Sequence, residues 1–180
     1  MVKQALELIE ECVEEAQQKR KAKLSGRLMR ALAHLAGKEQ EEAAWQTAGL
    51  LHDLDCFIKT IHVDLPLHGL KTVEILKDRE IGNEQVYQAI AAHNPHSGVM
   101  AENMMQRAMI VADCAVEAVA EVEKAKKEYT ASDIFEQMKK QMTSAQYQSE
   151  CEAFCTEAAL TKDKVFAALA EAAAVKKEDG

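Results

Sequence analysis

Apolar side chains recur every three or four residues along almost the whole 180-residue chain. This spacing places them on one face of an α-helix. Only seven Gly and two Pro interrupt the pattern, and aromatic residues make up 4% of the chain, a composition that favours helices over strands. We therefore expect an all-α protein, with helices over residues 3–22, 24–35, 41–54, 68–77, 84–93, 102–122, 132–157 and 162–176. The irregular stretch 55–66 is predicted to be a loop.

The charge of the chain limits its partners. The formal net charge is −8 and the pI is near 5.3, so the phosphate backbone of a nucleic acid would be repelled, and no aromatic stacking platform offsets this. No segment approaches the roughly 18 consecutive apolar residues of a membrane helix, and acidic residues occupy the place of a signal-peptide core. We expect a cytoplasmic protein that binds neither nucleic acid nor a membrane.

Five cysteines are present without a CxxC pair, which indicates neither a disulfide framework nor a zinc ribbon. We expect reduced and partly buried thiols. Cys151 and Cys155 lie one helical turn apart and could bind a soft metal together, although two ligands without nearby partners are more typical of core thiols.

A polar stretch divides the chain in two. Charged residues dominate positions 121–128. A new helix is predicted to begin after them, because Thr130–Asp133 has the spacing of a helix capping box. We therefore predict a helical domain over residues 1–122 and a C-terminal helical extension over 123–180. The extension is expected to pack on the same domain, and its amphipathic helices would also permit it to cover a site or to form a homodimer.

Five polar residues are expected to meet inside the helical bundle. Each lies near a predicted helix end or on an inward face, although about sixty residues separate the first from the last; the five are His52, Asp53, His68, His93 and Asp113. Imidazole and carboxylate groups bind Mn, Fe, Co, Ni and Zn. Such a metal would polarise a phosphoryl oxygen and lower the pKa of bound water, which suits phosphate ester hydrolysis. His34 and His62 are interpreted as ordinary hydrogen-bonded histidines.

The segments around these residues resemble those of a known family. LLHDLD (50–55), HGLKTVEIL (68–76), AIAAHNPHSG (89–98) and IVADCAVEAV (110–119) resemble, in order and spacing, the HD superfamily of metal-dependent phosphohydrolases, and most closely its small stand-alone bacterial members. The similarity spans about residues 20–122 and implies an HD-domain-like helical bundle. It also implies that His52 and Asp53 are the pair that gives the family its name. Asp113 would be its final aspartate, and His68 and His93 would be the additional histidines of two-metal members, with Asp53 as the bridge.

One position departs from the family pattern. Relatives have a histidine early in the second helix, and counting back from Leu28–Ala33 reaches Lys21. His34 cannot replace it, because thirteen residues of helix rotate it by roughly 220° and move it almost 20 Å along the axis. A protonated Lys21 cannot bind a metal, but it could hold a phosphate or take the place of a lost cation. The site would then keep one metal around Asp53, His68 and His93, or it would be degenerate.

The resulting prediction is a metal-dependent phosphohydrolase that acts on a small phosphate ester, with nucleotides among the candidates. Asp53 is the predicted catalytic residue, the five clustered residues are the predicted ligands of a divalent transition metal, and Lys21, Asn94 and His96 are predicted to bind the substrate. Ser97 could also contact it, and Lys19, Arg20 and Lys23 could attract an anion, although ordinary solvated loop and helix-end roles are the more common explanation for such residues. The alternatives are a non-catalytic ligand-binding or interaction module with a degenerate site, and a di-iron oxygenase.

Overall fold

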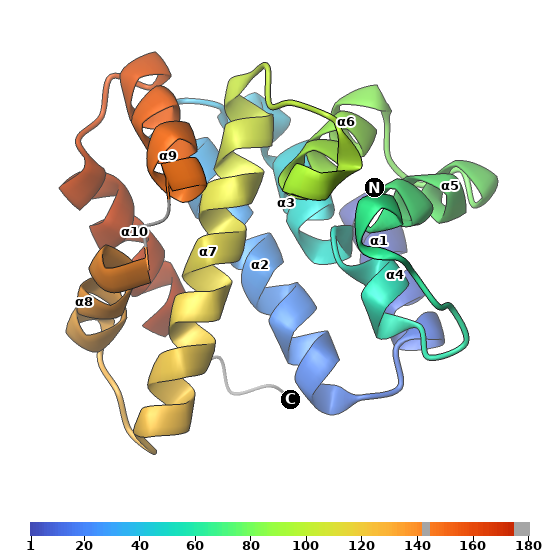
Figure 1. Ribbon diagram of the computed structural model, residues 1–180, viewed down its shortest axis with the longest axis horizontal. Coiled ribbons are helices and arrows are strands. Elements are labelled where there is room, and N and C mark those ends of the chain that lie inside the picture. Colours follow the sequence, from blue (N-terminus) through green and yellow to red (C-terminus); the bar gives the residue numbers. More distant parts are fainter. Residues whose placement is uncertain (142–144, 175–180) are drawn as a thin grey trace.

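The computed structural model describes residues 1–141 and 145–174, and every regular element within them is a helix (Figure 1). The all-α prediction is therefore confirmed. The α-helices are α1 (Val2–Cys12), α2 (Ala16–Leu35), α3 (Glu42–Leu51), α4 (Leu54–Phe57), α5 (Leu70–Asp78), α6 (Glu84–His93), α7 (Met104–Ala125), α8 (Ala131–Gln141), α9 (Ala145–Glu157) and α10 (Lys162–Ala174), and three short 3-10 turns are η1 (Glu39–Glu41), η2 (Leu65–Leu67) and η3 (Pro95–Ser97). In the described part of the chain, no helix has both the length and the apolar character needed to cross a membrane.

Two long helices, α2 and α7, lie side by side in the middle of the molecule (Figure 1). Helix α7 also contacts α3, α6, α8 and α9, and its buried side chains face several sides rather than one. A helix that is apolar over most of its circumference must be surrounded by other elements. Asp113 lies near the centre of this helix.

The N-terminal region differs from the prediction. The expected helix over 3–22 is interrupted at Val13, which is extended and only 1% exposed, and α2 then runs without a break from Ala16 to Leu35. Burial of Val13 against the core redirects the chain, which a helical count along the sequence could not reveal. Lys19 and Lys23 reach back to Glu10 at the end of α1, at 2.5 and 3.3 Å.

Helices α2 and α3 pack unusually closely. A Cβ atom at Gly49 would lie 2.6 Å from the carbonyl oxygen of Ser25, and one at Gly26 would lie 2.7 Å from Cγ of Leu50. Only glycine permits this separation. The close contact brings the first half of α2 near the residues that follow α3, and these residues form the site described below.

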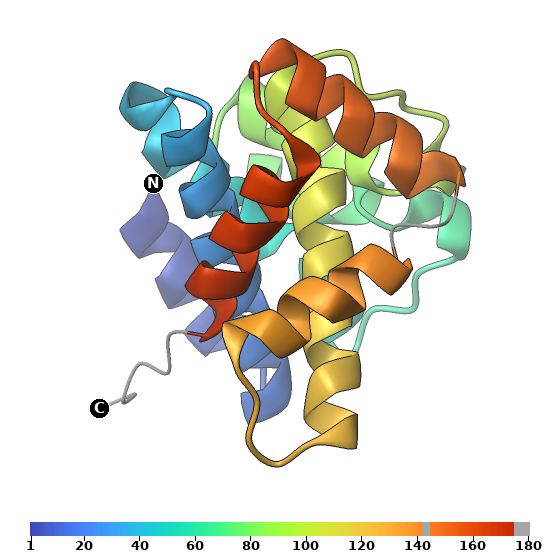
Figure 2. The same cartoon turned by 90° about the vertical axis from the view of Figure 1, so that its left-hand side faces the viewer.

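The C-terminal helices cover one side of α7 and α2 (Figure 2). Helix α8 contacts α7 and α10, α9 contacts α7, and α10 contacts α2. The capping box predicted before α8 is present, because the backbone N–H of Thr130 donates to Asp133 Oδ2 at 2.8 Å and that of Asp133 donates to Thr130 Oγ1 at 3.4 Å.

The single helix expected over 132–157 is assigned as two helices, α8 up to Gln141 and α9 from Ala145, and residues 142–144 lie outside the described chain. Both helices pack against α7 and α10. The expected helix over 162–176 is observed as α10 up to Ala174, and the last two positions of that prediction lie outside the described residues.

Candidate metal centre

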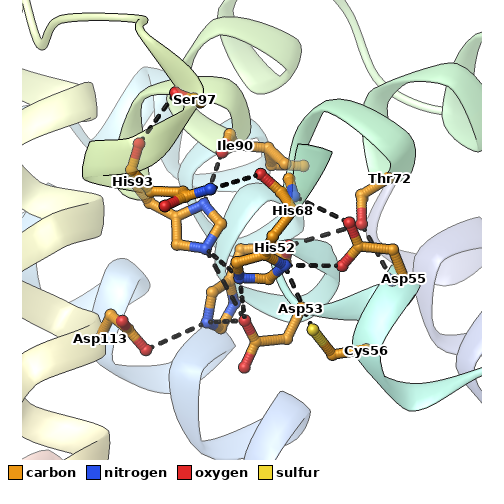
Figure 3. Close-up of polar contacts among 12 residues, drawn as sticks. His52, Asp53, Asp55, Cys56, His68, Thr72, Ile90, His93, Ser97 and Asp113 are labelled. Carbon is orange, nitrogen blue, oxygen red and sulfur yellow. Dashed lines mark hydrogen bonds and ion pairs between the residues drawn. The ribbon is translucent and has the colours of Figure 1, made fainter. Parts of the chain in front are cut away.

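Four helices bring together the five residues predicted as metal ligands (Figure 3). His52 and Asp53 follow α3, His68 precedes α5, His93 ends α6 and Asp113 lies within α7. The Nε2 atoms of the three histidines lie around one oxygen of Asp53, Oδ1, and a fourth contact joins His52 to Asp113. The distances to Oδ1 are 3.4 Å from His52, 3.3 Å from His68 and 3.7 Å from His93, and His52 Nε2 lies 3.3 Å from Asp113 Oδ1.

The other ring nitrogen of each histidine is fixed by the fold. His52 Nδ1 donates to the carbonyl oxygen of Gly49 at 2.9 Å, and His93 Nδ1 donates to that of Ile90 at 2.5 Å. A carbonyl oxygen only accepts, so Nδ1 must carry the proton in both rings, and the unprotonated Nε2 of the neutral form faces the cluster. Metal-binding histidines are typically held in this way.

The donor set fits a transition metal. His68 Nε2 and His93 Nε2 lie only 3.0 Å apart, and two lone pairs at that distance repel each other unless a proton or a cation is shared. His52, Asp53 and His93 each offer a ligand atom, and these atoms lie within 4.8 Å of one another. Imidazole nitrogens with carboxylate oxygens suit Mn, Fe, Co, Ni and Zn better than Mg or Ca.

Asp55 supports the cluster, a role that the sequence analysis did not assign. It is fully buried. Its Oδ1 accepts a hydrogen bond from His68 Nδ1 at 2.9 Å, and its Oδ2 accepts one from the backbone N–H of Gly69 at 2.8 Å. Burial alone would raise the pKa of Asp55, but these hydrogen bonds outweigh it and lower the pKa. The second aspartate of the LLHDLD motif was the available signal.

The sequence analysis did not assign a role to Asp55 because residues 55–66 were predicted to be a loop. The structure instead has the short helix α4 at the start of this stretch, and the backbone N–H of Asp55 donates to Thr72 Oγ1 of α5 at 3.0 Å.

Gly69, which follows His68, has φ +80°, and a Cβ there would lie 2.8 Å from the carbonyl oxygen of Ile90. A side chain at this position would therefore push His68 away from His93.

Lys21 reaches the cluster from α2. Its Nζ lies 2.6 Å from Asp53 Oδ2, the oxygen opposite the three histidines. Partial burial lowers the pKa of Lys21, but the charge of Asp53 more than offsets this and raises it, so the side chain is an ammonium at neutral pH. His34, on the same helix, is exposed and contacts Glu42 instead. Lys21 is thus the residue of α2 that faces Asp53.

The aspartates of the cluster are ionised. Burial would raise the pKa of Asp53, yet His52, His68, His93 and Lys21 together hold it well below the ordinary value. Asp113 is likewise lowered, because its hydrogen bond with His52 outweighs burial. Hydrogen bonds to Asp53 and Asp55 raise the pKa of His68 to about 12. Without a metal, the cluster therefore balances its carboxylates with protons and with Lys21.

The residues after α6 have mostly structural contacts. Asn94 is 3% exposed, and its amide donates to the carbonyl oxygens of Leu65 and His68, at 2.7 and 3.0 Å. Ser97 Oγ donates to the carbonyl oxygens of Ala91 and Asn94, both at 2.8 Å. Asn94 thus holds the backbone of His68 in place, and its predicted substrate contact stays a prediction. His96 is exposed beside it.

Of the five cysteines, Cys56 is the one that contacts the cluster within the described residues. Cys151 and Cys155 are buried, and burial raises the pKa of Cys151 to about 12, which keeps it a thiol. Cys56 is exposed and its Sγ lies 3.2 Å from His68 Nδ1. With Asp55 and His68 it forms another group whose atoms lie close enough to hold a metal.

The fold and the site define an all-α protein with a buried cluster of histidines and aspartates suited to a divalent metal. The model of the HD domain family matches residues 20–163, and the chain belongs to this family. The match begins in α2, just before Lys21, and includes every residue of the cluster. Neither the curated proteins nor the solved structures contain a significant match to the chain.

Proposed function

We propose that the protein is a metal-dependent phosphohydrolase that acts on a small phosphate ester. The observation that carries the proposal is the convergence of three imidazole Nε2 atoms on Asp53 Oδ1, within 3.3 to 3.7 Å, while the opposite ring nitrogens are held by the protein. Membership of the HD domain family supports the same class of chemistry.

The residues that would hold the metal are His52, Asp53, His68, His93 and Asp113. A divalent metal bound there would polarise a phosphoryl oxygen and supply hydroxide from water near neutral pH. Lys21 already neutralises Asp53 Oδ2, so we propose one metal on the side of Oδ1 rather than a pair.

The side chains around the cluster differ in exposure, with His68 18% exposed. The side chains of His52 and His93 are 0% and 3% exposed, whereas those of Asp113 and Lys21 are 19% and 39% exposed. A phosphate group entering from this side meets the Lys21 ammonium first. Lys21 would orient the phosphoryl group and offset its charge, which is electrostatic stabilisation supplied by a group already in place.

Replacement of Asp53 tests the proposal. Asp53→Ala removes the oxygen on which the three histidines converge, so we expect a folded protein with no bound metal and at least a hundredfold loss of phosphatase activity. Activity would be measured on a panel of phosphate esters with Mn, Fe, Co, Ni and Zn, and metal by elemental analysis. His62→Ala, at an exposed histidine outside the cluster, is the matched control. Undiminished activity in folded Asp53→Ala protein would refute the assignment.

A second function is favoured by the Lys21–Asp53 ion pair. By the family resemblance the ammonium takes the place of a histidine ligand, and the same cluster could then serve a non-catalytic module that binds a phosphorylated molecule. This alternative predicts binding of phosphate esters without turnover under every metal condition, and no metal in the purified protein.

A further inference from the structure

A second group of metal-binding side chains lies at the Nδ1 edge of the His68 ring. His68 Nδ1 is 2.9 Å from Asp55 Oδ1 and 3.2 Å from Cys56 Sγ, whereas Nε2 of the same ring is 3.3 Å from Asp53 Oδ1. In Figure 3, dashed lines join His68 to both Asp55 and Cys56. The two nitrogens of one ring therefore belong to two different groups of ligands.

The spacing within this second group suits a metal ion. Asp55, Cys56 and His68 each offer one ligand atom, and these atoms lie within 4.8 Å of one another. With the usual bond lengths, a tetrahedral zinc ion holds a nitrogen and an oxygen ligand about 3.3 Å apart, and a nitrogen and a sulfur ligand about 3.6 Å apart. The observed 2.9 and 3.2 Å are each shorter by about 0.4 Å, so small side-chain rotations would admit the ion.

The fold fixes two of the three ligands and leaves the third accessible. Asp55 is fully buried, and its second oxygen accepts a hydrogen bond from the backbone N–H of Gly69 at 2.8 Å. The side chain of His68 is 18% exposed, and Cys56 is exposed. An ion can therefore approach from solvent at Cys56 and meet a carboxylate and an imidazole already in place, with a position left for water.

The sulfur atom determines the chemical class of the ion. Imidazole and carboxylate groups accept many divalent ions, but a thiolate selects thiophilic ions such as zinc and disfavours Mg, Ca and Mn. The five residues proposed for the metal centre carry only nitrogen and oxygen donors. The two groups therefore differ in the metals that they prefer.

We propose that Asp55, Cys56 and His68 form a second metal site, the thiol site, which binds zinc or another thiophilic ion and competes with the metal centre for His68. A neutral imidazole binds a metal through one nitrogen while the other carries a proton. An ion at His68 Nδ1 therefore leaves Nε2 protonated and removes one ligand from the group around Asp53. Zinc in the thiol site would weaken the metal centre and would inhibit hydrolysis there, an effect that rests on the proposed function.

Cadmium titration of the metal-depleted full-length chain tests the thiol site directly, because cadmium bound to a thiolate absorbs in the ultraviolet. We expect this absorption in the wild type and also in Asp53→Ala, which lacks the oxygen at the centre of the other group. Cys56→Ser should lose it, and this variant should stay folded because Cys56 is exposed. Cys12→Ser should keep it and is the matched control, since Cys12 is the other cysteine that is not buried.

Dependence on His68 distinguishes a metal site from a single reactive thiol. His68→Ala should weaken cadmium binding at least about tenfold, whereas a thiol acting alone would bind cadmium equally well in both proteins. The proposal would be overturned by no absorption in the wild type, by absorption that remains in Cys56→Ser, or by equal cadmium affinity in His68→Ala.

Competition for His68 is tested with manganese, which prefers nitrogen and oxygen ligands to thiolates. Added manganese should raise the cadmium concentration for half-maximal absorption at least about fivefold in the wild type. It should have no such effect in Asp53→Ala. A wild-type titration that manganese leaves unchanged would overturn the competition, because either the ring is not shared or no metal centre exists to share it.

The outcome is separable from that of the proposed function. If the chain binds cadmium through Cys56 and His68 but no metal condition gives hydrolysis, the thiol site stands and the phosphohydrolase fails. If phosphate esters are hydrolysed but the wild-type chain binds no cadmium through Cys56, the phosphohydrolase stands and the thiol site fails.

Discussion

Lys21 is the residue that most distinguishes this site. It places a fixed positive charge on Asp53 Oδ2, at the helix position where the resemblance to the HD superfamily predicts a histidine. That a histidine has been replaced here stays a prediction, made by counting positions along the helix. The sequence could not show that the lysine contacts Asp53 directly, since that depends on how closely α2 approaches α3.

Lys21→His is expected to increase metal occupancy. An imidazole at this position adds a ligand and removes a competing cation, so metal per chain should rise, up to two ions where the wild type holds one. Elemental analysis after reconstitution with Mn or Zn would measure it. Lys23→His, on the exposed side of α2, is the control. No gain relative to that control would mean that residue 21 does not occupy a ligand position.

Metal binding should release protons at neutral pH. The pKa of His68 is raised to about 12 in the metal-free protein, so the ring is protonated at pH 7 and must lose a proton before Nε2 can bind a metal. Because protons compete with the metal for the ring of His68, the apparent metal affinity should rise with pH over the range below 12. Calorimetry at pH 7 in two buffers of different ionisation enthalpy should show about one proton released per metal.

Asp55→Asn tests the cause of that release. The substitution removes the charge that helps to keep His68 protonated, so fewer protons should be released on metal binding, while the loss of ring orientation should weaken the metal about ten- to a hundredfold. Identical heats in the two buffers for the wild-type chain would contradict the assigned protonation state.

At the scale of elements, the contact between α2 and α3 determines the geometry of the site. Gly49→Ala would place a methyl group 2.6 Å from a backbone oxygen of α2, and backbone cannot move aside as a side chain can. We expect a loss of about 1–3 kcal/mol in the free energy of unfolding and a weaker metal site. Gly26→Ala meets the movable side chain of Leu50 and should cost less. Chemical denaturation of both variants gives the comparison, and equal stabilities would argue against the close contact.

The predicted elements that were confirmed have local signals, and the others do not. Helix α6 was predicted at its observed bounds, because Gly82-Asn83 precede it and Asn94-Pro95 follow it; Asn83 caps it through a hydrogen bond from Val86 N–H. The break at Val13 depends on burial against distant parts of the chain. The same limit applies to Asp55, whose role arises from contacts made only in the folded chain.

At the scale of the whole molecule, the helices after residue 130 share the core with the rest. Phe154 of α9 is fully buried, as is Trp45 of α3 in the N-terminal half. Because both belong to one hydrophobic cluster, the chain should unfold in one cooperative step, although the sequence indicated a boundary near residue 122.

Phe154→Ala is expected to reduce the free energy of unfolding by about 3–5 kcal/mol. Denaturation would be followed by fluorescence of Trp45, the single tryptophan, and by far-ultraviolet circular dichroism. Both transitions should shift together. A shift in circular dichroism with an unchanged fluorescence transition would show that the C-terminal helices unfold independently.

The central claim is that the histidines and aspartates around Asp53 form a metal centre. The most direct test is inductively coupled plasma mass spectrometry of the untagged full-length protein, purified without chelator and again after reconstitution. We predict about one transition-metal ion per chain in the wild type and essentially none in Asp53→Ala. A folded wild-type protein that holds no metal even after reconstitution would contradict the claim.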